Sequence, residues 1–338
     1  MIDKRKSIDI QRDGAINIKI GDDDDASPAK EVLSLGDSLY VFKARGVYKV
    51  SLADQIDPER TNPNIPNVNQ QVLTKGYDSE VVGRVLLTAK ALFYRNADKQ
   101  EEGAVELIEG CIDLTRHIIE LQEMVAELDD KILGSCAAFE NAERKRDSLL
   151  LPSIPSLDKD IHNILVKTDK VRDGILNLYR IYFFPRAQKK PSLSEYDNAI
   201  EESLKPHTDL IEMWSKVSGA FSFIRDIRNA SVHRKEGQQV VVQNFKMNIN
   251  GEVLPPMIEV EHKNSPLGPI KVVEFVNSLV NLALDLAEGS IVLIKRSSLL
   301  KHNPLNELVV SLSSTNKQNQ SVRYCRAIKH NGQIMPLG

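Results

Sequence analysis

The sequence has 338 residues, of which 41% are hydrophobic and 27% are charged, and these near-average values exclude wholesale disorder. The length allows one large domain or two ordinary ones. The formal net charge of −3 excludes a global basic field, so any contact with nucleic acid must come from local clusters of cations.

The cysteines and the apolar segments restrict the cellular setting that we expect. Cys111, Cys136 and Cys325 lie far apart, which argues against a zinc site or a disulfide framework and favours a reducing cytoplasm. The segment Met1–Lys6 is followed by polar residues, so no signal peptide is predicted. The apolar stretch at 272–294 is interrupted by polar residues and is not expected to span a membrane. We therefore expect a cytoplasmic protein without membrane contact.

The first 76 residues are predicted to be β-rich or irregular. Ala15–Ile20 alternates apolar and polar residues as a strand does, and the four aspartates after Gly21 are interpreted as a solvated loop. Leu39–Phe42 and Val47–Val50 predict a hairpin. Asp57–Pro66 contains three prolines and is therefore predicted to be a connector that cannot form a helix.

A heptad stripe follows, after a shorter helical segment that begins near Asp78. Its apolar residues alternate spacings of four and three, and the helix is predicted to run towards Arg146 with an interruption at Gly134–Ser135. The stripe fits two interpretations, the central helix of an antiparallel bundle or a coiled coil between two chains, and the first is favoured. Its members are Leu107, Cys111, Leu114, Ile118, Leu121, Val125, Leu128 and Ile132.

Two further helices are predicted before residue 206. One covers Ile161 to Ile181, and a shorter one opens at Pro191–Ser192 and runs through Leu204. The next helix carries an apolar stripe of residues at helical spacing. That stripe consists of Leu210, Met213, Trp214, Val217, Ala220, Phe221, Ile224 and Ile227.

A hairpin, a last helix and a basic tail complete the prediction. The hairpin covers about residues 238–262, because Asn250–Gly251 is a strong signal for a two-residue turn. The last helix runs from Ile270 to about Ile294. From Lys295 onward there are seven Lys or Arg residues and one acid, Glu307, so the end of the chain is basic.

The end of the helix with the Trp214 stripe holds the candidate site. Arg228, Asn229 and His233 bring a permanent cation, an amide and an imidazole together within six residues. Cleavage of a phosphodiester needs such a set: a charge for the phosphate, a polar group that orients it, and a base near neutral pH. On an ideal helix Arg228 and His233 lie about 140° apart, so they converge only if the arginine reaches round or the helix frays near His233.

The spacing of arginine and histidine alone has little specificity. Arg296 with His302 and Arg323 with His330 show similar spacings. The asparagine directly after Arg228 and the amphipathic helix before it distinguish the candidate. The simpler alternative is an ordinary helix end, where Arg and His side chains meet loose carbonyl groups.

The segment Arg228–His233 resembles the Arg-Asn-x-x-x-His signature of the HEPN superfamily, whose active members are metal-independent endoribonucleases. The resemblance covers about residues 78–294. It implies a mainly α fold, a HEPN-like antiparallel helical bundle with a β-hairpin insertion and a β-containing N-terminal region. The corresponding division is an N-terminal region at 1–76, a helical domain at 77–296 and a basic tail at 297–338.

The resemblance also implies roles for the residues. Arg228 would stabilise the charged phosphorane, Asn229 would orient the phosphate, and His233 would act as base or acid. The RNA's own 2′-hydroxyl would attack, without metal or cofactor, at a cleft shared by two protomers. Lys235 stands where the branch paired with nucleotidyltransferases often has Tyr, which argues against that arrangement. The residues expected to support RNA binding are Arg225, Asp226, Arg234 and Lys235, with Lys189, Lys190, Arg323, Arg326 and Lys329 as a track.

These inferences give an endoribonuclease related to toxins or phage defence, with RNA and a second copy of the chain as partners and a regulatory protein as a further one. The alternatives are a non-catalytic module that binds nucleotides or RNA, and a helical scaffold assembled through the heptad stripe. The other histidines considered, His117, His162, His207 and His262, have no partner at metal-ligand spacing and are interpreted as structural.

Overall fold

A computed structural model describes residues 8, 20–21, 27–95, 103–141, 148–187, 189–301, 303, 305–312, 319–330 and 332–337. Contacts divide the chain into two compact units, residues 1–116 with 309–338 (unit 1) and residues 117–308 (unit 2). Unit 1 therefore contains residues 77–116, which the sequence analysis assigns to the helical domain, together with most of the predicted tail. The long helix α4 (Ala104–Glu140) contributes residues to both units.

Unit 1 begins with a four-stranded antiparallel sheet in the order β1-β2-β3-β4. The predicted hairpin is its centre, with Phe42 paired to Val47. The predicted connector follows a four-residue helix, and Asp57 holds it by accepting hydrogen bonds from the backbone N–H groups of Thr61 and Asn62. All of the strand expected at Ala15–Ile20 except Ile20, and the four aspartates, lie outside the described residues. The elements are β1 (Glu31–Leu35), β2 (Ser38–Phe42), β3 (Val47–Ser51), α2 (Ala53–Ile56) and β4 (Val68–Leu73).

The rest of unit 1 joins segments that lie far apart in the sequence. A π-helical turn, η1 (Val82–Leu87), continues into α3 (Thr88–Phe93), and α3 packs against β11. The C-terminal segment forms a three-stranded sheet in the order β10-β11-β12, which the sequence analysis does not predict. Its strands are β10 (Glu307–Ser311), β11 (Tyr324–His330) and β12 (Gln333–Leu337).

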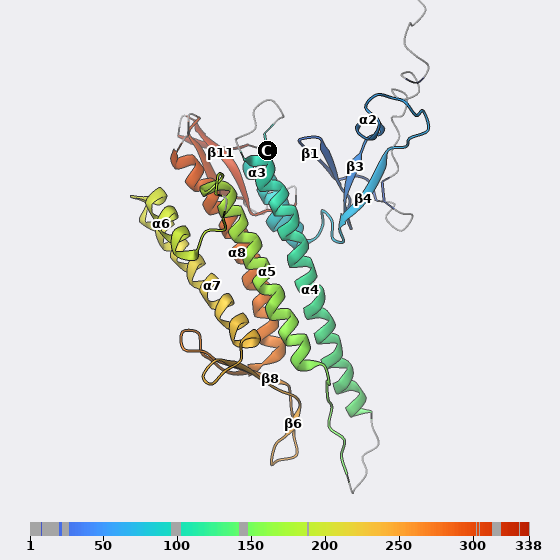
Figure 1. Cartoon of the computed structure of the whole chain (residues 1–338), viewed down its shortest axis with the longest axis vertical. Helices are drawn as coiled ribbons and strands as arrows, with labels where there is room; N and C mark the ends of the chain where they lie inside the picture. The colour runs from blue at the N-terminus through green and yellow to red at the C-terminus, as the bar shows by residue number, and fades with distance from the viewer. Residues whose placement is uncertain are drawn as a thin grey trace, which may run out of the picture. The chain divides into compact units, whose positions relative to one another are not determined.

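Four further helices form the centre of unit 2 together with the second part of α4 (Figure 1). Helix α5 packs against α7 and α8, and α6 packs against α7. Between α5 and α7 the ring of Trp214 meets those of Tyr179 and Phe221 edge to face, at centroid distances of 5.0 and 6.2 Å. All three rings are fully buried. The helices are α5 (Leu157–Phe183), α6 (Leu193–Leu204), α7 (Thr208–Val232) and α8 (Val272–Lys301).

All eight residues of the heptad stripe on α4 are at most 6% exposed in the single chain. This burial favours the first interpretation, a helix packed within its own chain, over a coiled coil between chains. The predicted interruption at Gly134–Ser135 is wrong, because α4 runs through both residues and ends at Glu140.

The hairpin of unit 2 divides into two ladders. β5 pairs with β8 and β6 with β7, and the turn at Asn250–Gly251 has Gly251 at φ +79°. A further strand, β9, extends the first ladder to the order β5-β8-β9, and this sheet contacts the end of α7 and the start of α8. The strands are β5 (Gln239–Gln243), β6 (Lys246–Met247), β7 (Val253–Leu254), β8 (Met257–Glu261) and β9 (Leu267–Lys271).

The predicted mainly α fold, a helical bundle with one hairpin insertion, is wrong for this chain. The structure is mixed, with 52% helix, 20% strand and four small antiparallel sheets among the described residues. Two of the strands that the sequence analysis misses, β4 and β12, are largely exposed. β12 has no buried residue and β4 has one, so neither carries the apolar alternation that reveals a half-buried strand.

Helix α8 is long and apolar enough to cross a membrane by length and composition, the one such helix in the described part of the chain. This is weak evidence for a span, because 61% of its most apolar window is buried inside the structure. The core helix of a soluble protein has the same properties.

Candidate functional site at the end of helix α7

The three signature residues lie where α7 ends. The helix stops at Val232, and His233 is its C-cap with φ −114° and ψ 61°. The chain then reverses in a tight turn, where Lys235 and Gln238 exchange backbone hydrogen bonds and Gly237 has φ +69°, a conformation that favours glycine. His233 therefore departs from ideal helical geometry, which is one of the two conditions under which it can approach Arg228.

Arg228 and Asn229 contact each other directly. The Nη1 group of Arg228 donates a hydrogen bond to Oδ1 of Asn229 at 3.1 Å. The Nε group of Arg228 is buried without a hydrogen bond to any residue that the structure describes, and it lies 3.7 Å from Oδ2 of Asp169 on α5. The side chain of Arg228 is 32% exposed and that of Asp169 is 17% exposed. The guanidinium is thus oriented from two sides, and part of it remains accessible.

Asp169 begins a chain of alternating charges that runs along α5 and ends at Lys190, beyond the helix. It lies 3.1 Å from Arg172, which donates to Asp173 at 2.9 Å, and Asp173 pairs with Lys190 at 2.8 Å. Burial raises the pKa of Asp169, although the cations Arg172 and Arg228 act in the opposite direction. Burial also acts to raise the pKa of Asp173, but hydrogen bonds from Lys190 and Arg172 outweigh it and lower that pKa.

The helices α5 and α7 run antiparallel along a polar seam. Asp158 lies 3.6 Å from Arg234, and the Nδ1 atom of His162 lies 2.9 Å from Oγ of Ser231. With Asp169 and Arg228 these pairs form three successive polar contacts, because residues at later positions on α5 meet earlier positions on α7.

Asp169 was not identified from the sequence, because it lies 59 positions from its partner Arg228. The sequence feature that could have pointed to Asp169 is a run of charged residues beside the buried face of α5, which includes Arg172, itself only 7% exposed.

His233 is exposed, and its ring makes no hydrogen bond to another described residue. Its backbone is fixed instead. Its N–H donates to the carbonyl oxygen of Asn229 at 2.8 Å. The amide of Gln238 donates to the carbonyl oxygens of Asn229 and His233, at 3.4 and 3.2 Å, and satisfies acceptors that a helix end otherwise leaves open. Gln238, which sequence reasoning also misses, therefore fixes the backbone that carries the imidazole.

The predicted supporting residues divide into two kinds. Arg225, Arg234 and Lys235 are exposed at the helix end. Asp226 has a structural role. It accepts a hydrogen bond from the hydroxyl of Ser265 at 2.8 Å, and its Oδ2 lies 3.5 Å from Nδ1 of His262. These contacts tie the loop between β8 and β9 to α7.

The other histidines and cations have separate locations. His117 and Glu120 contact each other on α4, and His207 is the exposed N-cap of α7. Lys189 and Lys190 line a cavity of about 310 Å³ with Asn177, Arg180 and Tyr196. Of the two other pairs with a similar spacing, Arg323 and His330 belong to unit 1. For the pair Arg296 and His302, His302 lies outside the described residues. Within the described residues no group of three or more His, Cys, Asp or Glu side chains is arranged to hold a metal ion.

No family model matches this chain, and neither does any curated protein or solved structure.

Proposed function

We propose that the protein is a metal-independent endoribonuclease whose active site is built on Arg228, Asn229 and His233. The observation that supports this most is that Arg228 is held in one orientation and is still accessible. Its guanidinium is oriented by Asn229 and Asp169 while its side chain stays 32% exposed. A preorganised cation beside an exposed imidazole suits a reaction in which a phosphate gains charge in the transition state.

The proposed reaction needs only groups of the chain and of the RNA. His233 removes the proton from a 2′-hydroxyl, and the 2′-oxygen attacks the adjacent phosphorus. Arg228 stabilises the charge on the pentacoordinate phosphorane, and Asn229 keeps the guanidinium in place. The bond from phosphorus to the 5′-oxygen breaks, and this oxygen takes a proton from an acid. The products are a 2′,3′-cyclic phosphate and a 5′-hydroxyl.

The acid that protonates the leaving oxygen is, in this proposal, the imidazolium of a second protomer. The resemblance to the HEPN signature supports a cleft shared by two chains. The exposure of His233 is consistent with this arrangement, because a ring that makes no hydrogen bond to another described residue of its own chain is available to a second chain. A role in growth arrest or phage defence follows from the same resemblance, since uncontrolled RNA cleavage stops growth.

The decisive experiment incubates the purified full-length protein with a single-stranded RNA in excess EDTA and maps the ends of the fragments. We expect fragments that carry a 2′,3′-cyclic phosphate and a 5′-hydroxyl, formed at the same rate with and without EDTA. An RNA in which the 2′-hydroxyls are methylated is the matched control and must stay intact. Binding of RNA without cleavage would instead support a non-catalytic RNA-binding module, and cleavage that stops in EDTA would refute the proposed chemistry.

A further inference from the structure

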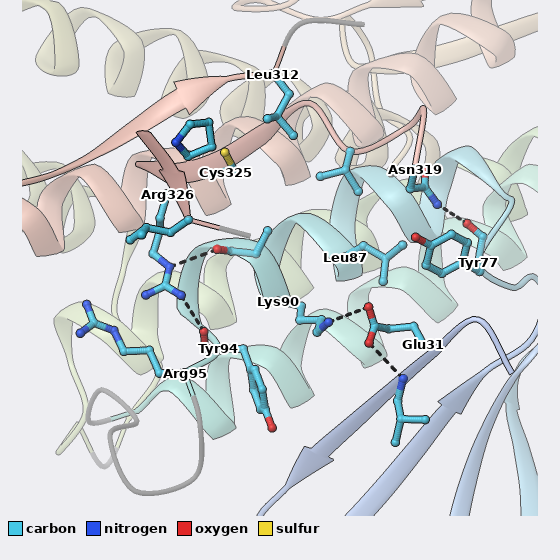
Figure 2. A pocket seen from close by; sticks show the side chains of 15 residues that line it. Glu31, Tyr77, Leu87, Lys90, Tyr94, Arg95, Leu312, Asn319, Cys325 and Arg326 are labelled. Carbon is cyan, nitrogen blue, oxygen red and sulfur yellow. Dashed lines mark hydrogen bonds and ion pairs between the residues drawn. The ribbon is translucent and has the colours of Figure 1, made fainter. Parts of the chain in front are cut away.

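Unit 1 contains the larger of the two cavities described here, and the proposed ribonuclease site does not use it. The cavity has a volume of about 670 Å³, within the range of about 300–1,000 Å³ that is typical of small-molecule sites. Figure 2 shows that its walls come from distant parts of the sequence. They are the start of β1, Tyr77, the segment from the end of η1 through α3 to Arg95, and the C-terminal sheet with the turn between β10 and β11.

An arginine is fixed at one end of the cavity. Arg326 of β11 donates from Nε to the carbonyl oxygen of Ala91 at 3.2 Å and from Nη2 to that of Tyr94 at 3.0 Å. These oxygens belong to the C-terminal end of α3, where a cation is favourable. Arg95 follows directly in the sequence and lines the same end of the cavity (Figure 2).

The charge of the lining favours an anion. Among the described residues, the lining includes three cations, Lys90, Arg95 and Arg326, and one carboxylate, Glu31, a formal charge of +2. Glu31 pairs with Lys90 at 2.7 Å.

The wall at the other end of the cavity is held by hydrogen bonds between the side chain of Asn319 and the backbone. Asn319, 8% exposed, donates to the carbonyl oxygen of Tyr77 at 2.5 Å and accepts the N–H of Ser321 at 2.8 Å. A side chain at Gly83 would meet Cβ of Ser321 at 2.4 Å, so glycine is needed there. Gly83 lies in η1, and short π-helical segments of this kind are rare and often occur at functional sites.

The surface between these ends is aromatic and apolar. Tyr77 and Tyr94 face the cavity together with Leu87 and Leu312 (Figure 2). Aromatic side chains with a hydroxyl suit a flat heterocycle, because the ring stacks on the base and the hydroxyl forms a hydrogen bond at its edge. A cationic end and an aromatic wall in one cavity match the two halves of a nucleotide.

We propose that this cavity binds a nucleoside phosphate, with the phosphate at Arg95 and Arg326 and the base between Tyr77, Tyr94 and Leu87. This binding site is separate from the proposed ribonuclease site in unit 2. It does not depend on that function, because every residue that lines it belongs to unit 1.

The test titrates the full-length protein calorimetrically with ADP, adenosine and pyrophosphate. We expect saturable binding of ADP, and weaker binding of adenosine and of pyrophosphate, because each fragment has one half of the recognised chemistry. Pyrophosphate that binds as tightly as ADP would overturn the aromatic half of the proposal, and adenosine that binds as tightly would overturn the anionic half. Absence of saturable binding by ADP at about millimolar concentration, the weak end of specific affinities, would overturn it entirely.

Two variants locate the binding. Arg95→Gln removes a cation and should weaken the binding of ADP at least about tenfold, in line with the loss of a charged hydrogen bond. Val322→Trp fills the cavity and should abolish binding. Arg186→Gln, an exposed cation of unit 2, is the control and should bind ADP as the wild type does. If Val322→Trp fails to fold by circular dichroism, Arg95→Gln and Leu312→Trp decide, and unchanged ADP affinity in folded variants would refute the site.

Discussion

The Nε atom of Arg228 on α7 lies 3.7 Å from the Oδ2 atom of Asp169 on α5. This contact joins the central residue of the proposed active site to the helix that packs against it. Because the two side chains are largely buried, the carboxylate acts on the guanidinium more strongly than a surface partner would. In the proposed active site we therefore expect Asp169 to be a positioning residue, which orients Arg228 and does not contact RNA.

We expect Asp169→Asn to lower the rate of RNA cleavage about tenfold to a hundredfold, as is usual when a residue that orients a catalytic group is lost. The change should appear in kcat, with KM nearly unchanged, because binding of the RNA does not involve Asp169. Single-turnover kinetics on one RNA measure the effect. The matched control is Asp158→Asn, since Asp158 lies on the same helix and near Arg234 but is 66% exposed. Equal losses in the two variants would contradict the positioning role.

His233→Ala and Arg228→Ala should each reduce cleavage at least about a hundredfold, the effect expected for loss of a general base or of a charge stabiliser. Their stabilities should differ. His233 is exposed, so its loss should leave unfolding unchanged. Loss of Arg228 leaves Asp169 less compensated and should destabilise unit 2 by about 1–3 kcal/mol. The fluorescence of Trp214, the single tryptophan, buried in unit 2, monitors this. His207→Ala, at the opposite end of the same helix, is the control, and a His233→Ala protein that cleaves RNA would refute the assignment.

The site was partly predictable from sequence. The apolar stripe through Trp214 predicts α7, and the signature falls on its last turns as expected. The exit of His233 from the helix was one of two possibilities, and the turn at Gly237 decides it. Asp169 was not predictable, because its contact with Arg228 depends on how α5 and α7 pack. The cavity of unit 1 was not predictable either, since its walls come from both ends of the chain and no periodicity links them.

The charge chain on α5 predicts an unusual pH dependence of stability. The pKa of Asp173 is lowered in the folded protein, so its stabilising contribution is present above the ordinary aspartate pKa, about 3.9, and is lost as the pH falls through the folded value. The pKa of Asp169 is raised, so its ionised form destabilises the folded protein at neutral pH, and this destabilisation is relieved as the pH falls and the carboxylate is protonated. Urea unfolding of Asp173→Asn and Asp169→Asn at pH 7 and pH 4, monitored by Trp214, tests this. The stability difference from wild type should shrink at pH 4 for the first variant and move in favour of wild type for the second. If the stability differences of both variants from wild type moved in the same direction between pH 7 and pH 4, the opposite effects of the two carboxylates would be refuted.

If the active site is shared between two chains, cleavage per chain should fall when the protein is diluted into monomers, before Trp214 reports unfolding. Sedimentation velocity measures the oligomeric state at the concentrations used for the kinetic assay. Mixing the wild-type protein with an excess of His233→Ala sharpens the test. A mixed dimer has a single His233 and lacks either the base or the acid of the proposed reaction, so cleavage per wild-type chain should fall as His233→Ala is added. A fully active monomer would contradict the shared site.

Binding of RNA by a chain of net charge −3 should depend on a few exposed cations near His233. Arg225 and Lys235 are both exposed at this helix end, and the double variant Arg225→Gln, Lys235→Gln should bind more weakly. Each phosphate contact on a single strand contributes about 0.7 to the slope of log affinity against log salt, so loss of two contacts should flatten that slope by about 1.4. Measurement in a His233→Ala background separates binding from cleavage. The bond that is cut should not change in the corresponding active protein, because phosphate contacts position the RNA and do not read its bases.

Arg326 is not expected to belong to this track, since α3 carbonyl groups hold it in the cavity of unit 1. Arg186→Gln is the control for removal of an exposed cation elsewhere in unit 2. An unchanged slope in the double variant would show that RNA approaches His233 over another surface, and Lys189 and Lys190 would then be the cations to test.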